Sequence, residues 1–282
     1  MIKKKFKKIF QSIFKSNQLV SLEYPLELKS NYNTTKAHQG LEVIIQKQNS
    51  HYSLLLNYAL NFENDFSNIS NTSADPLKPY WNNNFFPGLD IIMLYSILNF
   101  YKPKKYIEIG CGTSTKVTKL YKEKFDSSLN ITCIDPAPRQ EILNVADEWI
   151  NQPIQKVDLS IIKNLVENDI LFFDGTHVLY PNSDVMWFFW EILPIIPKGV
   201  IVQIHDIYLP YDYPDFMIER YYNENYILGS VLIANPDKYE IISPNFYISE
   251  QKQLSAIIKK IWQLPQMQGV EKHGGSFWFK IK

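Results

Sequence analysis

The sequence predicts an α/β protein with a doubly wound, mostly parallel sheet. From about residue 85 onward, short β-type runs alternate with segments of helical length, which is the pattern of βαβ units. One run ends in a turn with two glycines that opens a helix, and acids or histidines follow three other runs. The 282-residue length and 45% hydrophobic content suit one large domain with an appendage, or two small domains.

The elements can be placed in order along this part of the chain. Pro87 opens an apolar run, GLDIIMLYSILNFYK, which is expected to be helical. Strands are then expected at 104–109, 130–134, 154–157, 170–173 and 199–204. Helices are expected at 114–126, 138–150, 159–167, 183–195 and Tyr213–Ala234. The last β-type runs, 239–248 and 276–282, need no crossover helix between them, so the sheet can finish with an antiparallel strand.

The first 80 residues are expected to form an extension ahead of a main domain at 81–282. This extension is predicted to consist of a basic helix, a linker, a helical segment and a polar loop, at residues 1–15, 16–35, 36–62 and 63–84.

Charge is balanced over the whole chain but not along it. Lysine and arginine total 29, and aspartate and glutamate total 29. Residues 1–15 hold six lysines and no acid, with an apolar face of Phe and Ile, while the rest of the chain is acidic. Such a helix favours peripheral contact with an anionic membrane; a solvated tail or a helix packed on a partner subunit is the alternative.

The composition also bears on partners and location. A neutral total with only two arginines, Arg139 and Arg220, argues against a nucleic-acid partner. Two cysteines are too few for a disulfide framework or a thiolate zinc site, which favours a reducing compartment. The expected location is cytoplasmic, with residues 1–15 at the inner face of the cytoplasmic membrane.

The strongest motif is the run YIEIGCGTST, which extends from Tyr106 to Thr115. Gly110 and Gly112 let the backbone approach a ligand, and the helix that follows offers free amides. Thr115 stands where the dinucleotide fingerprint requires a third glycine. Glu108 would repel a pyrophosphate but attract a cationic ligand. An ordinary strand-to-helix turn is the alternative interpretation.

Asp135 ends the next strand, where a doubly wound fold places an acid on ribose hydroxyls. A helix-capping carboxylate ahead of Pro136 is the competing interpretation.

From Trp81 onward, about 200 residues resemble a class I S-adenosylmethionine-dependent methyltransferase. The likeness is greatest to a bacterial group with motifs of the types EIGSGFST, DGSH and HDIFLPYDYP. The matching segments here, in order, are Glu108–Thr115, Asp174–His177, His205–Pro214 and a closing Gly274–Trp278. No part of the first 80 residues takes part in the resemblance.

The resemblance implies a Rossmann-like sheet of seven strands whose last strand is antiparallel. It also implies that S-adenosylmethionine is the cofactor, with Glu108 and the glycine turn at its methionine end and Asp135 on its ribose. The full set of expected cofactor-binding residues is Glu108, Gly110, Cys111, Gly112, Thr113, Ser114, Asp135 and Asp174.

A third group of residues follows the fourth and fifth strands: Asp174, His177, His205 and Asp206. Because the carboxyl ends of parallel strands meet at one edge, these side chains are expected to converge there. Asp174 and Asp206 could bind a divalent cation such as Mg²⁺. Alternatively His177 or His205, with Asp206, could deprotonate an acceptor. A third possibility is a histidine with a structural role only.

The expected activity is methyl transfer to a hydroxyl oxygen of a small-molecule or glycan acceptor. Tyrosines at 211, 213, 221 and 222 suit a ring-shaped acceptor. The alternatives are a nicotinamide-dependent oxidoreductase on the same fold, and a non-catalytic cofactor-binding module that docks at a membrane.

Overall fold

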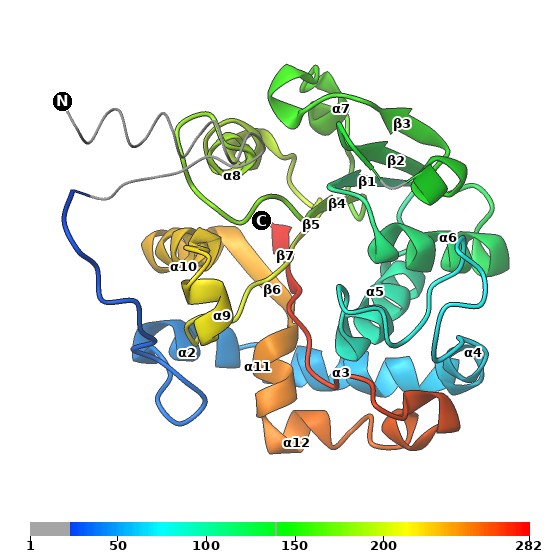
Figure 1. Cartoon of the computed structure of the whole chain (residues 1–282). Coiled ribbons are helices and arrows are strands. Elements are labelled where there is room, and N and C mark those ends of the chain that lie inside the picture. The colour runs from blue at the N-terminus through cyan, green and yellow to red at the C-terminus, as the bar shows by residue number, and fades with distance from the viewer. Residues whose placement is uncertain (1–22, 139) are drawn as a thin grey trace, which may run out of the picture.

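The computed structural model describes residues 23–138 and 140–282, and in them seven strands form one sheet (Figure 1). The strand order is β3-β2-β1-β4-β5-β7-β6, in which β1 to β5 are parallel and β7 runs antiparallel between β5 and β6. The strands are β1 Lys105–Ile109, β2 Asn130–Ile134, β3 Glu148–Ile150, β4 Ile170–Phe173, β5 Ile201–Ile204, β6 Tyr239–Pro244 and β7 Phe277–Ile281. The predicted fold class is confirmed.

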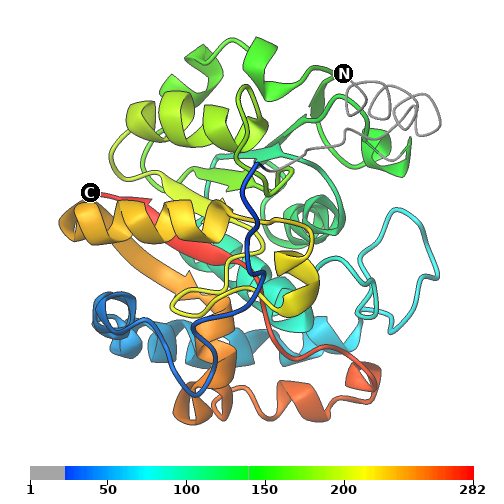
Figure 2. The ribbon, with the colours of Figure 1, turned by 60° about the vertical axis from the view of Figure 1, so that its left-hand side comes forward.

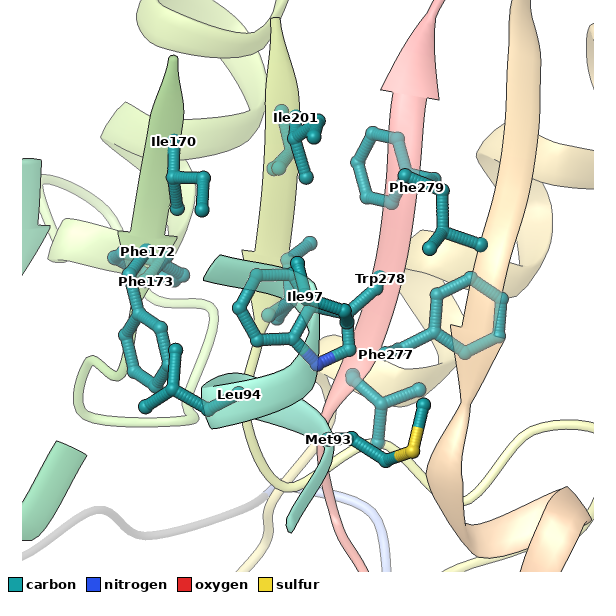
Figure 3. Packing of buried hydrophobic residues seen from close by; sticks show 14 of the residues in the cluster. Met93, Leu94, Ile97, Ile170, Phe172, Phe173, Ile201, Phe277, Trp278 and Phe279 are labelled. Carbon is teal, nitrogen blue, oxygen red and sulfur yellow. The ribbon is translucent and has the colours of Figure 1, made fainter. Parts of the chain in front are cut away.

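The centre of the sheet is buried on both faces, which explains its unbroken apolar strands. All residues of β4 and β5 are buried. Helix α5 (Gly88–Tyr101) crosses this region, and its Met93, Leu94 and Ile97 lie over the strands beside Trp278 of β7 (Figure 3). The apolar sequence of α5 is therefore the sequence of a helix enclosed on nearly all sides.

The segment before residue 80 packs against the sheet domain rather than apart from it. Helix α3 (Asn49–Ala59) contacts α5, and α2 (Gln39–Gln46) contacts α10 (Glu224–Ala234). Residues from Leu41 onward share one hydrophobic core with the strands. The expected boundary at residue 80 marks where the sequence resemblance begins. As a boundary between two domains, it stays a prediction.

The third strand was expected in the wrong place. Residues Ile154–Lys156 form a 3₁₀ turn, and β3 lies at Glu148–Ile150, inside the stretch 138–150 that was expected to be helical. Only Gln140–Asn144 is helical there, as a 3₁₀ turn. This short edge strand is defined by its backbone pairing with β2. Its Glu148 and Trp149 are exposed, so the sequence contains no apolar pattern that would predict a strand here.

Two expected helices are shorter or interrupted. Helix α7 covers only Ser160–Lys163. The stretch 213–234 divides into α9 (Asp215–Ile218) and α10, because Asn223 between them is tied to another loop. Its N–H donates to the His177 carbonyl at 3.0 Å, and its Oδ1 accepts from the Leu179 N–H at 2.6 Å.

The remaining differences lie at the ends of elements. Helix α8 (Asp184–Trp187) continues through a π turn, Phe188–Ile192, and a 3₁₀ turn, Leu193–Ile195. The β-type run 239–248 changes to helix α11 (Asn245–Glu250) after Pro244. The other helices are α4 Glu63–Ser67, α6 Thr113–Phe125 and α12 Lys252–Ser255, with 3₁₀ turns at Leu60–Phe62, Pro236–Lys238, Ile261–Gln263 and Pro265–Met267.

Among residues 23–138 and 140–282, no helix combines the length and hydropathy needed to span a bilayer. The basic helix expected at 1–15 lies outside the described residues.

Candidate functional site

The glycine turn after β1 is held at the point where β1, β2 and β4 end. Gly110 has φ of +81°, and a Cβ built on it would lie 1.9 Å from the Asp174 carbonyl oxygen. Its N–H donates to the Ile134 carbonyl at 3.0 Å. Position 110 therefore requires glycine on two counts, backbone conformation and space. Around Gly112, by contrast, nothing lies within 4 Å of such a Cβ.

Glu108 lies beneath this turn and is completely buried. It accepts hydrogen bonds from the Ser114 hydroxyl and, at 2.9 Å, from Thr115 Oγ1, so it holds the first turn of α6. Burial raises the pKa of Glu108 to about 8, although the hydroxyl bonds oppose that shift. The partners of Glu108 are thus side chains of the turn's own helix, and Thr113 and Ser114 are themselves buried.

Asp135 joins the turns after β1 and β2. Its Oδ2 accepts from the Cys111 N–H at 3.2 Å, and its Oδ1 accepts from the Ala137 N–H at 2.8 Å. The second bond closes a local turn at Pro136. It is not the helix cap that competed with the ribose interpretation, because the stretch expected to be helical contains only a 3₁₀ turn at Gln140–Asn144. Asp135 is only partly buried, and each of its oxygens keeps a lone pair for another donor.

The four side chains expected to converge after β4 and β5 do so. Nε2 of His177 lies 3.4 Å from Asp174 Oδ1 and 3.4 Å from Asp206 Oδ2. Nδ1 of His205 lies 3.7 Å from Asp174 Oδ1 and 3.5 Å from Asp206 Oδ1. Acids and imidazoles thus alternate around a ring. His177 and Asp206 both adopt positive φ, +62° and +53°, which is uncommon for residues other than glycine and marks backbone strain at this site.

Two buried carboxylates that the sequence analysis missed hold the outer nitrogens of the histidines. Glu224 Oε1 lies 3.0 Å from His177 Nδ1, and Asp90 Oδ2 lies 3.2 Å from His205 Nε2. Both acids are fully buried. For Asp90 a signal was available, because it is an acid inside an otherwise apolar run. Nothing in the sequence distinguishes Glu224 from an ordinary glutamate in the first turn of a helix.

Asp90 also explains the closing glycine motif. Its carboxylate accepts from the Gly275 N–H at 2.7 Å and the Ser276 N–H at 3.0 Å. A Cβ on Gly274 would lie 2.5 Å from Asp90 Oδ1, so glycine there allows the chain to wrap closely around the carboxylate.

These contacts set the charges of the cluster. Burial opposes the charged imidazole of His177, but Glu224, Asp174 and Asp206 outweigh it and raise its pKa to about 9. Burial likewise opposes charge on His205, yet Asp174 and Asp206 raise its pKa well above the usual value. Burial also raises the pKa of Glu224 to about 7. Both shifts favour the cationic form of the imidazoles.

The carboxylates of the ring differ from each other. Burial would raise the pKa of Asp174, but the two histidines hold it below the ordinary range. For Asp206 burial prevails and raises the pKa. Asp174 is thus the acid of the ring that keeps its charge most firmly.

A cavity of about 1020 Å³ opens over the ring. Asp174, His177, His205 and Asp206 line it, together with aromatic side chains from several segments: Tyr32, Phe85, Tyr208, Tyr211, Tyr213, Phe216, Tyr222 and Phe246. The expected tyrosines 211, 213 and 222 are among them, whereas Tyr221 is not among the lining residues. The residues of the glycine turn do not line the cavity, but Gly110 lies against the backbone of Asp174, which does.

Within the described part of the chain, no group of three or more His, Cys, Asp or Glu side chains is arranged to hold a metal ion.

Comparisons with known proteins add distant likenesses. No family model matches the chain. An uncharacterised protein of Archaeoglobus fulgidus is 31% identical over 139 residues, which are 46% of this chain and 61% of that protein. The chain thus matches less than two thirds of the length of this relative.

Several solved structures are similar in fold. The plantazolicin methyltransferase BpumL, in complex with a triazolic desmethylPZN analog and SAH, is 12% identical with a TM-score of 0.43, covering 86% of this chain and 99% of its own. An O-methyltransferase from Bacillus cereus in complex with SAH is 13% identical with a TM-score of 0.40, covering 87% and 91%. The SAH-bound methyltransferase PaMTH1 of Podospora anserina is 16% identical with a TM-score of 0.41, covering 68% and 77%. Likenesses at this level do not assign an activity.

Proposed function

We propose that the protein transfers the methyl group of S-adenosylmethionine to a hydroxyl oxygen of a small-molecule or glycan acceptor. One observation carries the proposal. Asp174 contacts the glycine turn through its carbonyl and the histidine ring through its carboxylate, so a single residue separates the turn from the acceptor cavity. Donor and acceptor sites this close allow direct transfer between bound molecules, which positioning alone accelerates strongly.

The residues present fit the cofactor. The turn at Gly110, Cys111 and Gly112 is tight on the protein side and open at Gly112, which leaves room for a ligand. Asp135 keeps acceptor capacity for ribose hydroxyls, and ionised Asp174 favours a positive charge nearby. When bound, the cofactor would supply an electrophilic methyl group on a sulfonium. Glu108, with Ser114 and Thr115, acts by holding the start of α6 under that ligand.

The histidine ring would handle the acceptor's proton. His177 presents Nε2 to the ring while Glu224 fixes Nδ1, so its neutral form can accept a hydroxyl proton at Nε2. That form is the minority at neutral pH because the pKa is about 9. His205, held by Asp90, and Asp206 would orient the hydroxyl from the other side of the ring.

The alternative with Asp174 and Asp206 as ligands of Mg²⁺ receives less support. The described residues hold no arranged group of metal ligands, so no step is derived through a cation.

Titration calorimetry with S-adenosylmethionine, S-adenosylhomocysteine and NAD⁺ tests the cofactor. We expect binding of the first two, weakened by Asp135→Ala and by Glu108→Ala. Binding of NAD⁺ alone would replace the proposal with an oxidoreductase. Labelled methyl transfer to fractionated cell extract then tests the acceptor, and label found only in protein would contradict a small-molecule or glycan acceptor.

The lysine-rich residues 1–15 support a separate proposal, peripheral contact of a cytoplasmic protein with an anionic membrane. Deleting them should lower co-sedimentation with vesicles of phosphatidylglycerol and phosphatidylethanolamine, while binding of S-adenosylhomocysteine stays unchanged. Equal co-sedimentation of the deleted and full chains would contradict it.

A further inference from the structure

One wall of the acceptor cavity comes from a segment that the sequence resemblance leaves out. Ser30, Tyr32, Asn33 and Thr34 line the cavity beside the histidine ring. From the sequence alone, these residues are expected to be linker. We refer to residues 30–38 as the strap.

The strap is fastened to the loop after β5 by one carboxylate. Oδ2 of Asp212 accepts from the Asn31 N–H at 2.6 Å and from the Tyr32 N–H at 3.1 Å. The N–H of Asp212 donates in return to the Tyr32 carbonyl at 2.9 Å. Asp212 is only 8% exposed, and hydrogen bonds to a charged acceptor away from water are among the stronger ones in proteins.

The other end of the strap is tied to the same loop. The His38 N–H donates to the Pro210 carbonyl at 2.9 Å, and His38 Nδ1 accepts from the Leu41 N–H at 3.2 Å to cap α2. The rings of Tyr32 and His38 meet edge to face with centroids 5.1 Å apart. Figure 2 shows this dark blue segment running down beside the yellow helix α9.

Hydrogen bonds rather than core packing hold the strap. The main hydrophobic core of the described residues begins at Leu41, after the strap, and residues 23–29 before it are exposed. Few buried apolar contacts and a small number of bonds are the marks of a segment with low local stability. Loss of the Asp212 carboxylate should therefore loosen the strap, beginning at Asn31 and Tyr32, without unfolding the sheet.

We propose that the strap selects the acceptor: fastened by Asp212, it closes one side of the cavity and presents Tyr32 to the bound molecule. This inference rests on the proposed function, because it takes the cavity to be the acceptor site. It assigns residues 30–38 a role in specificity that neither the glycine turn nor the histidine ring supplies.

Three single variants of the full chain separate the parts of this inference. Asp212→Ala removes the fastening, Tyr32→Ala keeps the main-chain bonds but removes the ring, and Glu219→Gln is a control at an exposed acid of the same region. Hydrogen exchange measured by mass spectrometry reports on the strap. Affinity ultrafiltration of the small-molecule fraction of a cell extract, read by mass spectrometry, reports which compounds each variant retains.

For Asp212→Ala we expect exchange in residues 31–38 to become about tenfold faster or more, with S-adenosylhomocysteine binding unchanged. Both Asp212→Ala and Tyr32→Ala should retain a different set of compounds from the wild type, and Tyr32→Ala should keep the slow exchange. Glu219→Gln should match the wild type in both measurements.

Unchanged exchange in Asp212→Ala would overturn the fastening, and unchanged retention in both cavity variants would overturn the role in selection. Hydrogen exchange and compound retention do not depend on turnover, so both can be read even if the wild type transfers no methyl group. Absence of methyl transfer in the wild type would instead count against the proposed function.

Discussion

Glu224 Oε1 lies 3.0 Å from His177 Nδ1, in a contact that buries the carboxylate completely. The second oxygen of Glu224 has no hydrogen-bond partner among the described residues. This carboxylate is therefore committed to the imidazole, fixing its ring and its charge while Nε2 remains directed at Asp174 and Asp206.

Replacing Glu224 by Gln should move the pH dependence of methyl transfer. The amide oxygen can still accept from Nδ1, but the negative charge that raises the pKa of His177 is lost. The rising limb of kcat against pH should shift to lower pH, while KM for the cofactor stays the same. A matched profile of Glu219→Gln serves as the control, and an unmoved limb in Glu224→Gln would show that Glu224 does not set the charge of His177.

Removing either imidazole should reduce turnover and spare cofactor binding. Loss of a general base costs about 10²–10⁴-fold in rate, so we expect a decrease of that order for His177→Ala and a smaller one for His205→Ala. Calorimetry with S-adenosylhomocysteine checks that the cofactor site persists. Full turnover in both variants would eliminate the histidine-base mechanism.

The cluster should make the folded protein less stable at alkaline pH. The pKa of His177 rises from an ordinary 6.5 to about 9, so the folded chain holds that proton more tightly than the unfolded chain. This contribution is complete below pH 6.5 and is lost as the pH rises through 9. Glu224, raised from 4.5 to about 7, acts in the same direction at lower pH.

Thermal unfolding followed from about pH 6 to pH 10 measures this loss, which should be on the order of 1–3 kcal/mol. In His177→Asn, the dependence between pH 6.5 and 9 should flatten. An equally steep decline in that variant would assign it to other groups.

The two glycines of the turn should respond differently to alanine. Gly110→Ala places a Cβ against the Asp174 carbonyl in a left-handed conformation, which costs at least about 1–2 kcal/mol in backbone strain alone. Gly112→Ala meets no protein atom, so it should fold normally and lose affinity for S-adenosylhomocysteine by filling the ligand's space. Normal stability of Gly110→Ala, or undiminished affinity of Gly112→Ala, would show that the turn has another role.

Local sequence patterns were sufficient to predict a structural feature wherever the residues that determine it are close together in the sequence. The apolar runs of β4 and β5 and the glycine turn at 110–112 were placed correctly, because burial on both faces and a strand-to-helix turn each leave a short-range signature. The edge strand at Glu148–Ile150 was missed, since its pairing comes from the backbone of β2 and not from its own side chains.

The sequence by itself thus determined the mostly parallel α/β sheet, the glycine turn and which acids and histidines share the carboxyl edge of the sheet. Only the tertiary structure decided what surrounds them. Asp90 reaches His205 from a helix that precedes the first strand, Glu224 reaches His177 from one that follows the fifth, and residues of the strap line one side of the cavity. The reason is physical: a contact between distant segments depends on how helices and loops pack on the sheet, and no periodicity in either segment records its partner.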